Sequence, residues 1–129
     1  MYALKIPAQR CMMVEVTWLV VADGGRARVF RMPGLTLDLQ EVEVLVNDEY
    51  TGTVLTEKDR EKFAKRVATY LDEGRLHQLY NRLRLAMESK FLGMVRSNLS
   101  EEARRMIFEQ ISEDLLPLST QEIQARLRK

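Results

Sequence analysis

The sequence predicts one α/β domain built around a mixed five-stranded sheet, on three observations. Two apolar segments flank Asp23-Gly24-Gly25, and Asp-Gly and Gly-Gly pairs are typical of type I′ hairpin turns, which need positive φ angles. Beyond residue 56, helical periodicity alternates with short strand-like segments, and parallel strands need helical crossovers between them. The chain has 129 residues, which is enough for one ordinary hydrophobic core.

The first third of the chain is predicted to be a three-stranded antiparallel meander. Val14–Ala22 is rich in β-branched residues and almost wholly apolar, which indicates a buried strand. Arg26–Met32 alternates apolar residues with arginine, which indicates a strand with one solvated face. Leu37–Val46 is a third strand whose apolar parity changes, so a bulge near Gln40–Glu41 would keep its later valines on the inner face. These valines are Val42, Val44 and Val46.

A capping box and an apolar stripe predict a long helix in the middle of the chain. Thr56 and Asp59 have the spacing of a capping box. Gly74 is a natural stop, so the helix is expected to end near Glu73. A short helical piece is expected at Arg75–Tyr80. The apolar stripe, interpreted as core, consists of Phe63, Val67, Tyr70 and Leu71.

The sequence predicts that short strands and helices alternate in the last part of the chain. Arg82–Met87 and Met106–Ser112 are the fourth and fifth predicted strands. The three helices around them are expected to begin at serine caps, namely Ser89, Ser100 and Ser119, the last with Glu122 as its capping-box partner. The block Phe91-Leu92-Gly93 is expected to be a packing element in which the glycine permits close helix approach.

Composition limits the expected binding partners and cellular location of the chain. There are 20 Lys and Arg against 19 Asp and Glu, a formal net charge of +1, so only a local basic patch is available to bind nucleic acid. The one cysteine, Cys11, has no internal disulfide partner, which favours a reducing, cytoplasmic location. The apolar stretch near the N-terminus is too short to span a bilayer, and no membrane insertion is expected. We expect residues 1–12 to be a flexible N-terminal extension and residues 13–129 to form the single domain.

Several segments, taken in order, resemble a known family. They are Trp18–Phe30, Phe63-Ala64 with Val67-Ala68 and Tyr70-Leu71, Phe91-Leu92-Gly93 with Arg96, Asp114-Leu115, and Ser119 with Glu122-Ile123. Together they resemble the bacterial host attachment protein family, which is related to the central domain of archaeal and eukaryotic class-I peptide-release factors. The resemblance covers about residues 14–127. It implies an RNase H-like arrangement of the five strands and association with the ribosome or another structured RNA.

Two departures from the family pattern bear on function. Release factors carry a Gly-Gly-Gln tripeptide, whereas this chain has Gly24-Gly25-Arg26 and no Gly-Gly-Gln. The family's Ala-Pro-Pro-like turn is replaced by Met87-Glu88-Ser89. We therefore expect a non-catalytic binding module that needs no cofactor.

Arginines on the predicted strands are the candidate RNA-binding residues. The set consists of Arg26, Arg28, Arg31, Arg82 and Arg84. A patch of this kind would contact the phosphate backbone, and its binding would weaken with salt. The competing interpretation is that these side chains only solvate a strand face.

Two other functions compete with RNA binding. One is a protein-interaction domain linked to host attachment that forms a homodimer through an exposed sheet edge. The other is a metal-dependent nuclease with Asp23 and Glu88 as weak metal-ligand candidates at the ends of adjacent strands. The only histidine, His77, has no catalytic neighbours in the sequence and is interpreted as a surface or helix-terminal residue.

Overall fold

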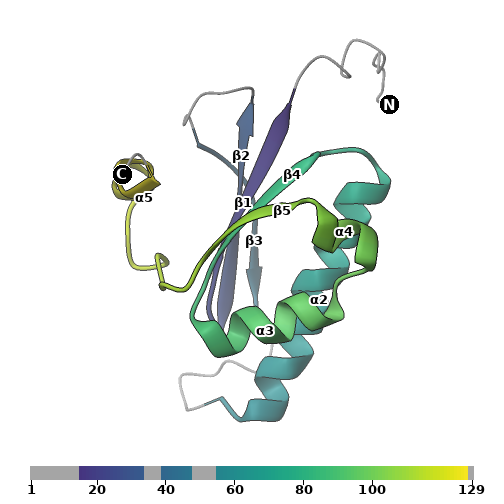
Figure 1. Cartoon of the computed structure of the whole chain (residues 1–129). Helices are drawn as coiled ribbons and strands as arrows, with labels where there is room; N and C mark the ends of the chain where they lie inside the picture. The colour runs from purple at the N-terminus through teal and green to yellow at the C-terminus, as the bar shows by residue number, and fades with distance from the viewer. Residues whose placement is uncertain (1–14, 34–38, 48–54, 128–129) are drawn as a thin grey trace.

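The computed structural model describes residues 15–33, 39–47 and 55–127 (Figure 1). The predicted extension at residues 1–12 and the predicted strand residue Leu37 lie outside these ranges. In chain order the elements are β1 (Val16–Ala22), β2 (Arg26–Pro33), β3 (Gln40–Val46), α2 (Glu57–Leu76), β4 (Arg82–Ala86), α3 (Ser89–Asn98), α4 (Glu101–Arg105), β5 (Ile107–Ile111) and α5 (Thr120–Leu127).

The five strands form one mixed sheet in the order β3-β2-β1-β4-β5. β1 pairs antiparallel with β2, and β2 pairs antiparallel with β3. β4 runs parallel to both β1 and β5. Helices α2, α3 and α4 lie on one side of the sheet and α5 lies on the other (Figure 1). The predicted meander followed by helical crossovers is confirmed.

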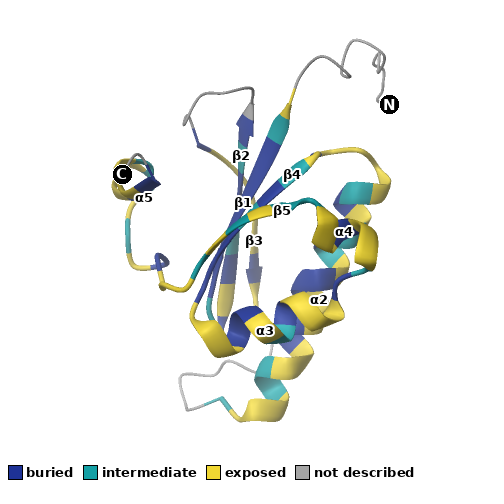
Figure 2. Cartoon of the chain, viewed as in Figure 1, coloured by how far each residue is buried: buried dark blue, intermediate teal, exposed yellow. Residues whose placement is uncertain are grey.

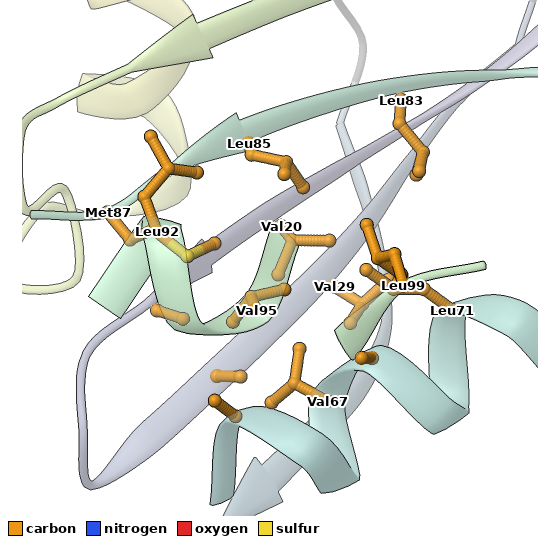
Figure 3. Packing of buried hydrophobic residues seen from close by; sticks show 14 of the residues in the cluster. Val20, Val29, Val67, Leu71, Leu83, Leu85, Met87, Leu92, Val95 and Leu99 are labelled. Atoms are coloured by element: carbon orange, nitrogen blue, oxygen red, sulfur yellow. The ribbon is translucent and has the colours of Figure 1, made fainter. Parts of the chain in front are cut away.

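The larger core lies between the sheet and the helices α2 and α3. Val20 and Val29 from the sheet pack with Val67 and Leu71 of α2 (Figure 3). Trp18 lies in the same core, where its ring stacks against that of Tyr70 with the centroids 5.8 Å apart. The predicted apolar stripe of α2 is therefore core.

A second, smaller core lies on the opposite face of the sheet. Leu19 and Phe30 pack there against Leu116 and against Ile123 of α5. Because neighbouring residues of β1 enter different cores, the strand is buried on both faces, as its continuous apolar run predicted. Figure 2 shows β1 and β2 largely buried, whereas β3 is exposed along most of its length.

The helix starts follow the predicted caps with one exception. The capping boxes of Thr56 and Ser119 are both present, and the Ser100 hydroxyl accepts a hydrogen bond from the Ala103 amide at 3.1 Å. Helix α3 is capped by Glu88, one residue before the predicted Ser89. The Glu88 carboxylate accepts hydrogen bonds from the amides of Lys90 and Phe91 at 3.0 and 2.8 Å.

The predicted stop at Gly74 is wrong, because α2 continues through it to Leu76. Gly74 is buried against Trp18, and a Cβ at this position would lie 2.8 Å from Trp18 Cζ3. The glycine is thus needed for close packing of the helix on the sheet. The separate helical piece expected after it is replaced by a turn in which Gln78 has a φ of 58°.

The predicted placement of the β3 valines is also wrong. The register with β2 shifts so that Val29 lies opposite Glu43 and Phe30 lies opposite Glu41, which makes Val42 the extra, bulged residue. The bulge therefore falls after Glu41, one or two positions beyond the prediction, and Leu45 is the residue that faces the core. The three valines are exposed: Val42 at 40%, Val44 at 44% and Val46 at 47%.

Two glycines differ from their predicted roles. The φ of Gly24 lies outside the left-handed region, so the hairpin turn is not type I′. The Asp23 carboxylate shapes the turn instead by accepting the amides of Gly25 and Arg26 at 2.8 and 3.0 Å. Gly93 is exposed, and a Cβ there would have no neighbour within 4 Å, so this residue does not permit a close helix approach.

Candidate nucleic-acid interface

Arg28, one of the predicted RNA-binding residues, is engaged in holding the fold together. Its Nε lies 3.1 Å from a Glu41 carboxylate oxygen. Its Nη1 donates to the Leu118 carbonyl at 3.2 Å, and its Nη2 donates to the Thr120 hydroxyl at 3.5 Å. The guanidinium therefore connects β2 to β3 and to the start of α5.

Arg82 and Arg84 lie side by side on the same face of the sheet as Arg28. Arg82 forms an ion pair with Glu15 at 2.9 Å, and Arg84 forms one with Glu109. Both guanidinium groups also lie over the Phe108 ring, 4.1 and 5.6 Å from its centroid. Their charges are thus largely compensated within the chain.

Of the other two predicted arginines, Arg31 lies on the opposite face of the sheet. Arg31 lies opposite Trp18 in the sheet, so it projects from the face that carries the larger core, and its Nη1 donates to Gln40 at 3.0 Å. Arg26 is exposed at the end of β2. Because alternate residues of a strand point to the same face, Arg26 shares the face of Arg28, and the structure brings four of the five arginines to one face and separates only Arg31 from them.

The weak metal-ligand candidates serve local structure. Asp23 orders the hairpin turn and Glu88 caps α3, so both carboxylates accept hydrogen bonds from backbone amides. Among residues 15–33, 39–47 and 55–127 there is no group of three or more potential metal ligands of the His, Cys, Asp or Glu type. His77 is the exposed C-cap of α2, and Cys11 lies outside the described ranges.

A basic surface on α2 is a candidate site that sequence reasoning missed. Lys58, Lys62 and Lys65 are exposed on this helix, and none of them has an ion-pair partner in the part of the chain that the structure describes. The signal was present in the sequence, since Lys58 and Lys62 stand four residues apart and Lys65 follows three later. Residues at these spacings lie on one side of a helix.

Two shallow grooves border this surface and share Lys62 and Lys65. The first, of about 440 Å³, lies between α2 and β3. The second, of about 370 Å³, lies between α2 and α3 and includes Met94 and Ser97. Two lysines thus stand on the ridge between two hollows, where both amines are accessible to an anion.

The first groove also contains an ordered aromatic ring. Tyr70 lines it together with Leu45 of β3, and the Tyr70 ring is stacked on Trp18 at an interplanar angle of 19°. Burial, and to a lesser degree the charge of Glu43, raise the pKa of Tyr70 above its ordinary value. The tyrosine hydroxyl therefore keeps its proton at neutral pH and can donate a hydrogen bond.

Arg66 adds a further cation to this groove. Its Nη1 donates to the Val46 carbonyl at 2.6 Å, and its guanidinium lies 5.9 Å from the Phe63 ring centroid. These contacts fix the guanidinium beside the edge of β3. Three cations near an aromatic ring are the side-chain types with which proteins contact nucleic acid backbones and unpaired bases.

The fold and this surface define a mixed α/β domain with a basic helix face. Within the described ranges, every helix is too short or too polar to cross a lipid bilayer. The chain belongs to the family described as "Protein required for attachment to host cells", whose model matches residues 47–127. This confirms the resemblance noted in the sequence.

Solved structures with the same fold include proteins of archaea. One is described as "Archaeal protein", with a TM-score of 0.56, 11% identity and coverage of 86% of this chain and 34% of that one. Another is the crystal structure of the archaeal translation termination factor aRF1, with a TM-score of 0.54, 12% identity and coverage of 87% and 36%. This chain spans about a third of the length of either structure. The comparison with curated proteins found no match.

Proposed function

We propose that this protein is a non-catalytic binding module that associates in the cytoplasm with the ribosome or another structured RNA. The observation that carries the proposal is the set of α2 lysines without carboxylate partners among the described residues, namely Lys58, Lys62 and Lys65. Ammonium groups of this kind gain binding free energy by displacing counterions from phosphates. The likeness to a translation termination factor supports the same partner.

The absence of catalysis is part of the proposal and rests on the sequence. The chain contains no Gly-Gly-Gln. Its Gly24-Gly25 pair lies in the turn between β1 and β2, and the Arg26 that follows is the first residue of β2. We also propose that the fold is RNase H-like. The strand order β3-β2-β1-β4-β5, with its antiparallel and parallel halves, supports that name.

The test is co-sedimentation of the purified chain with ribosomes at low and high salt. We expect the wild-type chain to pellet at low salt and to be released at high salt. Replacing Lys62 and Lys65 together by glutamate should abolish pelleting. The matched control replaces Arg104 and Arg105 of α4 by glutamate, which changes the net charge equally away from the grooves. A wild-type chain that stays in the supernatant at low salt overturns the proposal.

A second candidate function, homodimer formation, has its own observation. Val42, Val44 and Val46 expose apolar surface on β3, which is an edge of the described sheet, and such edges pair with other strands unless they are protected. Sedimentation equilibrium should then give twice the chain mass at any salt concentration. Val44→Lys should convert the dimer to monomer, and a wild-type chain of monomeric mass at high concentration excludes this function.

A further inference from the structure

The groove between α2 and β3 has opposite charges at its two ends. Its α2 residues recur every three or four positions, with adjacent pairs at 65–66 and 69–70, and so form one stripe along the helix. They are Lys62, Lys65, Arg66, Thr69, Tyr70 and Glu73. The cations occupy the N-terminal part of the stripe and the carboxylate occupies the C-terminal part. Lys65 and Glu73 are eight residues apart, which is about 12 Å along the helix axis.

An aromatic ring stands between the two charged ends. Tyr70 is held in place because its ring stacks on Trp18, and Trp18 is in turn packed against Tyr80 with the ring centroids 4.8 Å apart. Gly74 lies directly against Trp18 and leaves the indole ring little room to move. A ring that is already ordered loses little conformational entropy when a second ring stacks on it.

The carboxylates at the Tyr70 end exclude a phosphate there and favour a hydrogen-bond donor. Glu73 lines the groove, and Glu43 of β3 is close enough to Tyr70 to affect its hydroxyl. A phosphate is attracted instead to Lys62 and Lys65 at the other end. The groove is thus divided into an anion end, an aromatic middle and an acceptor end.

We propose that this groove binds one unpaired nucleotide of RNA, with its phosphate at Lys62 and Lys65, its base against Tyr70 and an amino group of the base directed to Glu73. The proposal rests on the proposed RNA-binding function and specifies its substrate as single-stranded RNA. In a duplex the bases are stacked on each other and cannot reach a tyrosine ring. Cytosine presents an N4 amino donor to a carboxylate, whereas uracil presents a carbonyl acceptor at the same position.

The experiment measures fluorescence anisotropy of labelled oligo(C), oligo(U) and a duplex RNA at low salt. Oligo(C) and oligo(U) have the same charge and ring size, so their difference reports the edge of the base, where cytosine has the N4 amino group and an N3 acceptor and uracil has O4 and an N3–H donor. We expect oligo(C) to bind about fivefold more tightly than oligo(U), and both to bind more tightly than the duplex. Glu73→Gln should remove most of the preference for oligo(C).

Variants of Tyr70 test the stacking contact. Tyr70→Leu should weaken oligo(C) binding by about tenfold, in keeping with stacking free energies measured in other proteins, while Tyr70→Phe should bind almost as well as the wild type. Trp18 is the only tryptophan of the chain and contacts Tyr70, so its fluorescence should change when oligo(C) binds. If Tyr70→Leu fails to fold, the comparison of oligo(C) with oligo(U) and Glu73→Gln still decides the proposal.

The outcomes separate this site from the wider function. Equal affinity for all three RNAs, with binding still lost on replacing Lys62 and Lys65 by glutamate, overturns the nucleotide site and leaves the RNA-binding function standing. No binding of any RNA at low salt, together with no ribosome pelleting, overturns both. Binding of duplex in preference to single strands also overturns the nucleotide site.

Discussion

At the scale of single residues, Trp18 positions α2 on the sheet through three contacts. Its ring contacts the rings of both Tyr70 and Tyr80, and the backbone of Gly74 approaches the edge of the indole formed by Cζ3 and Cη2. The Tyr80 hydroxyl donates to the Leu71 carbonyl of α2 at 2.6 Å. This cluster fixes the height of α2 above the sheet and, with it, the position of the groove.

Gly74→Ala should destabilise the protein although alanine favours helix by about 1 kcal/mol. The new Cβ would lie 2.8 Å from Trp18 Cζ3, and overpacking of a core costs about 1–3 kcal/mol. Gly93→Ala is the matched control, because its Cβ would meet nothing within 4 Å. We expect the control to stabilise the protein by about 0.5–1 kcal/mol. Urea denaturation measures both, and equal effects of the same sign would contradict the packing argument.

The stability of the protein should fall in alkaline solution because of Tyr80. Burial and the charge of Asp72 raise the pKa of Tyr80 far above its ordinary value, with Arg75 acting in the opposite direction. The unfolded chain loses this proton near a pH of about 10 while the folded chain keeps it, so the free energy of unfolding decreases as the pH rises above that value.

Tyr80→Phe provides the check on this pH dependence. The variant loses the hydrogen bond to Leu71, which costs about 1 kcal/mol at neutral pH, but it has no phenol at this position to ionise. The difference in the free energy of unfolding between wild type and variant should therefore shrink as the pH rises through about 10. A constant difference, measured by urea denaturation across this range, would show that Tyr80 does not titrate as inferred.

At the scale of elements, the start of α3 shows how a side chain fixes a helix terminus. The Glu88 carboxylate accepts two amides of the first turn, and a negative charge at a helix N-terminus is favourable. Glu88→Ala should therefore cost about 1 kcal/mol. Ser89→Ala should change stability by less than about 0.5 kcal/mol, since Ser89 is exposed and lies one residue inside the helix. Thermal denaturation measures both variants. If Ser89→Ala destabilised the protein more than Glu88→Ala, Ser89 would be the cap, as the sequence predicted.

Helix α2 combines a buried stripe with a basic surface. Its buried residues include Phe63, Val67 and Leu71, whereas Lys62 and Lys65 are exposed on a different side. The sequence predicted the buried stripe because a 3.6-residue period in apolar residues is a direct signal. The lysines carried no such signal, since exposed charges are frequent on every helix and only the position of β3 forms the groove beside them.

At the scale of the whole molecule, α5 and the segment before it form a separate layer on the sheet. Leu116 and Ile123 cover Leu19 and Phe30, and Arg28 binds both the Leu118 carbonyl and the Thr120 hydroxyl. This layer buries one side of the sheet that the helices α2, α3 and α4 leave uncovered (Figure 1).

Arg28→Ala should loosen this layer. Loss of its hydrogen bonds should destabilise the protein by about 1–3 kcal/mol and increase amide hydrogen exchange in α5 more than in α2. Arg26→Ala, an exposed arginine on the same strand, should change stability by less than about 0.5 kcal/mol. Uniform exchange changes over both helices would argue against a local connection.

The sequence by itself determined the order of elements, the capping boxes at Thr56 and Ser119, and the strand buried on both faces. These features follow from local periodicity and from side chains that bond to nearby backbone groups. Only the tertiary structure decided which arginines are engaged in holding the fold, because Arg82 forms an ion pair with Glu15 across 67 positions and Arg28 donates a hydrogen bond to Thr120 across 92. The exposure of the β3 valines and the groove beside α2 were also decided only by the tertiary structure, since both depend on how distant segments align in register and pack.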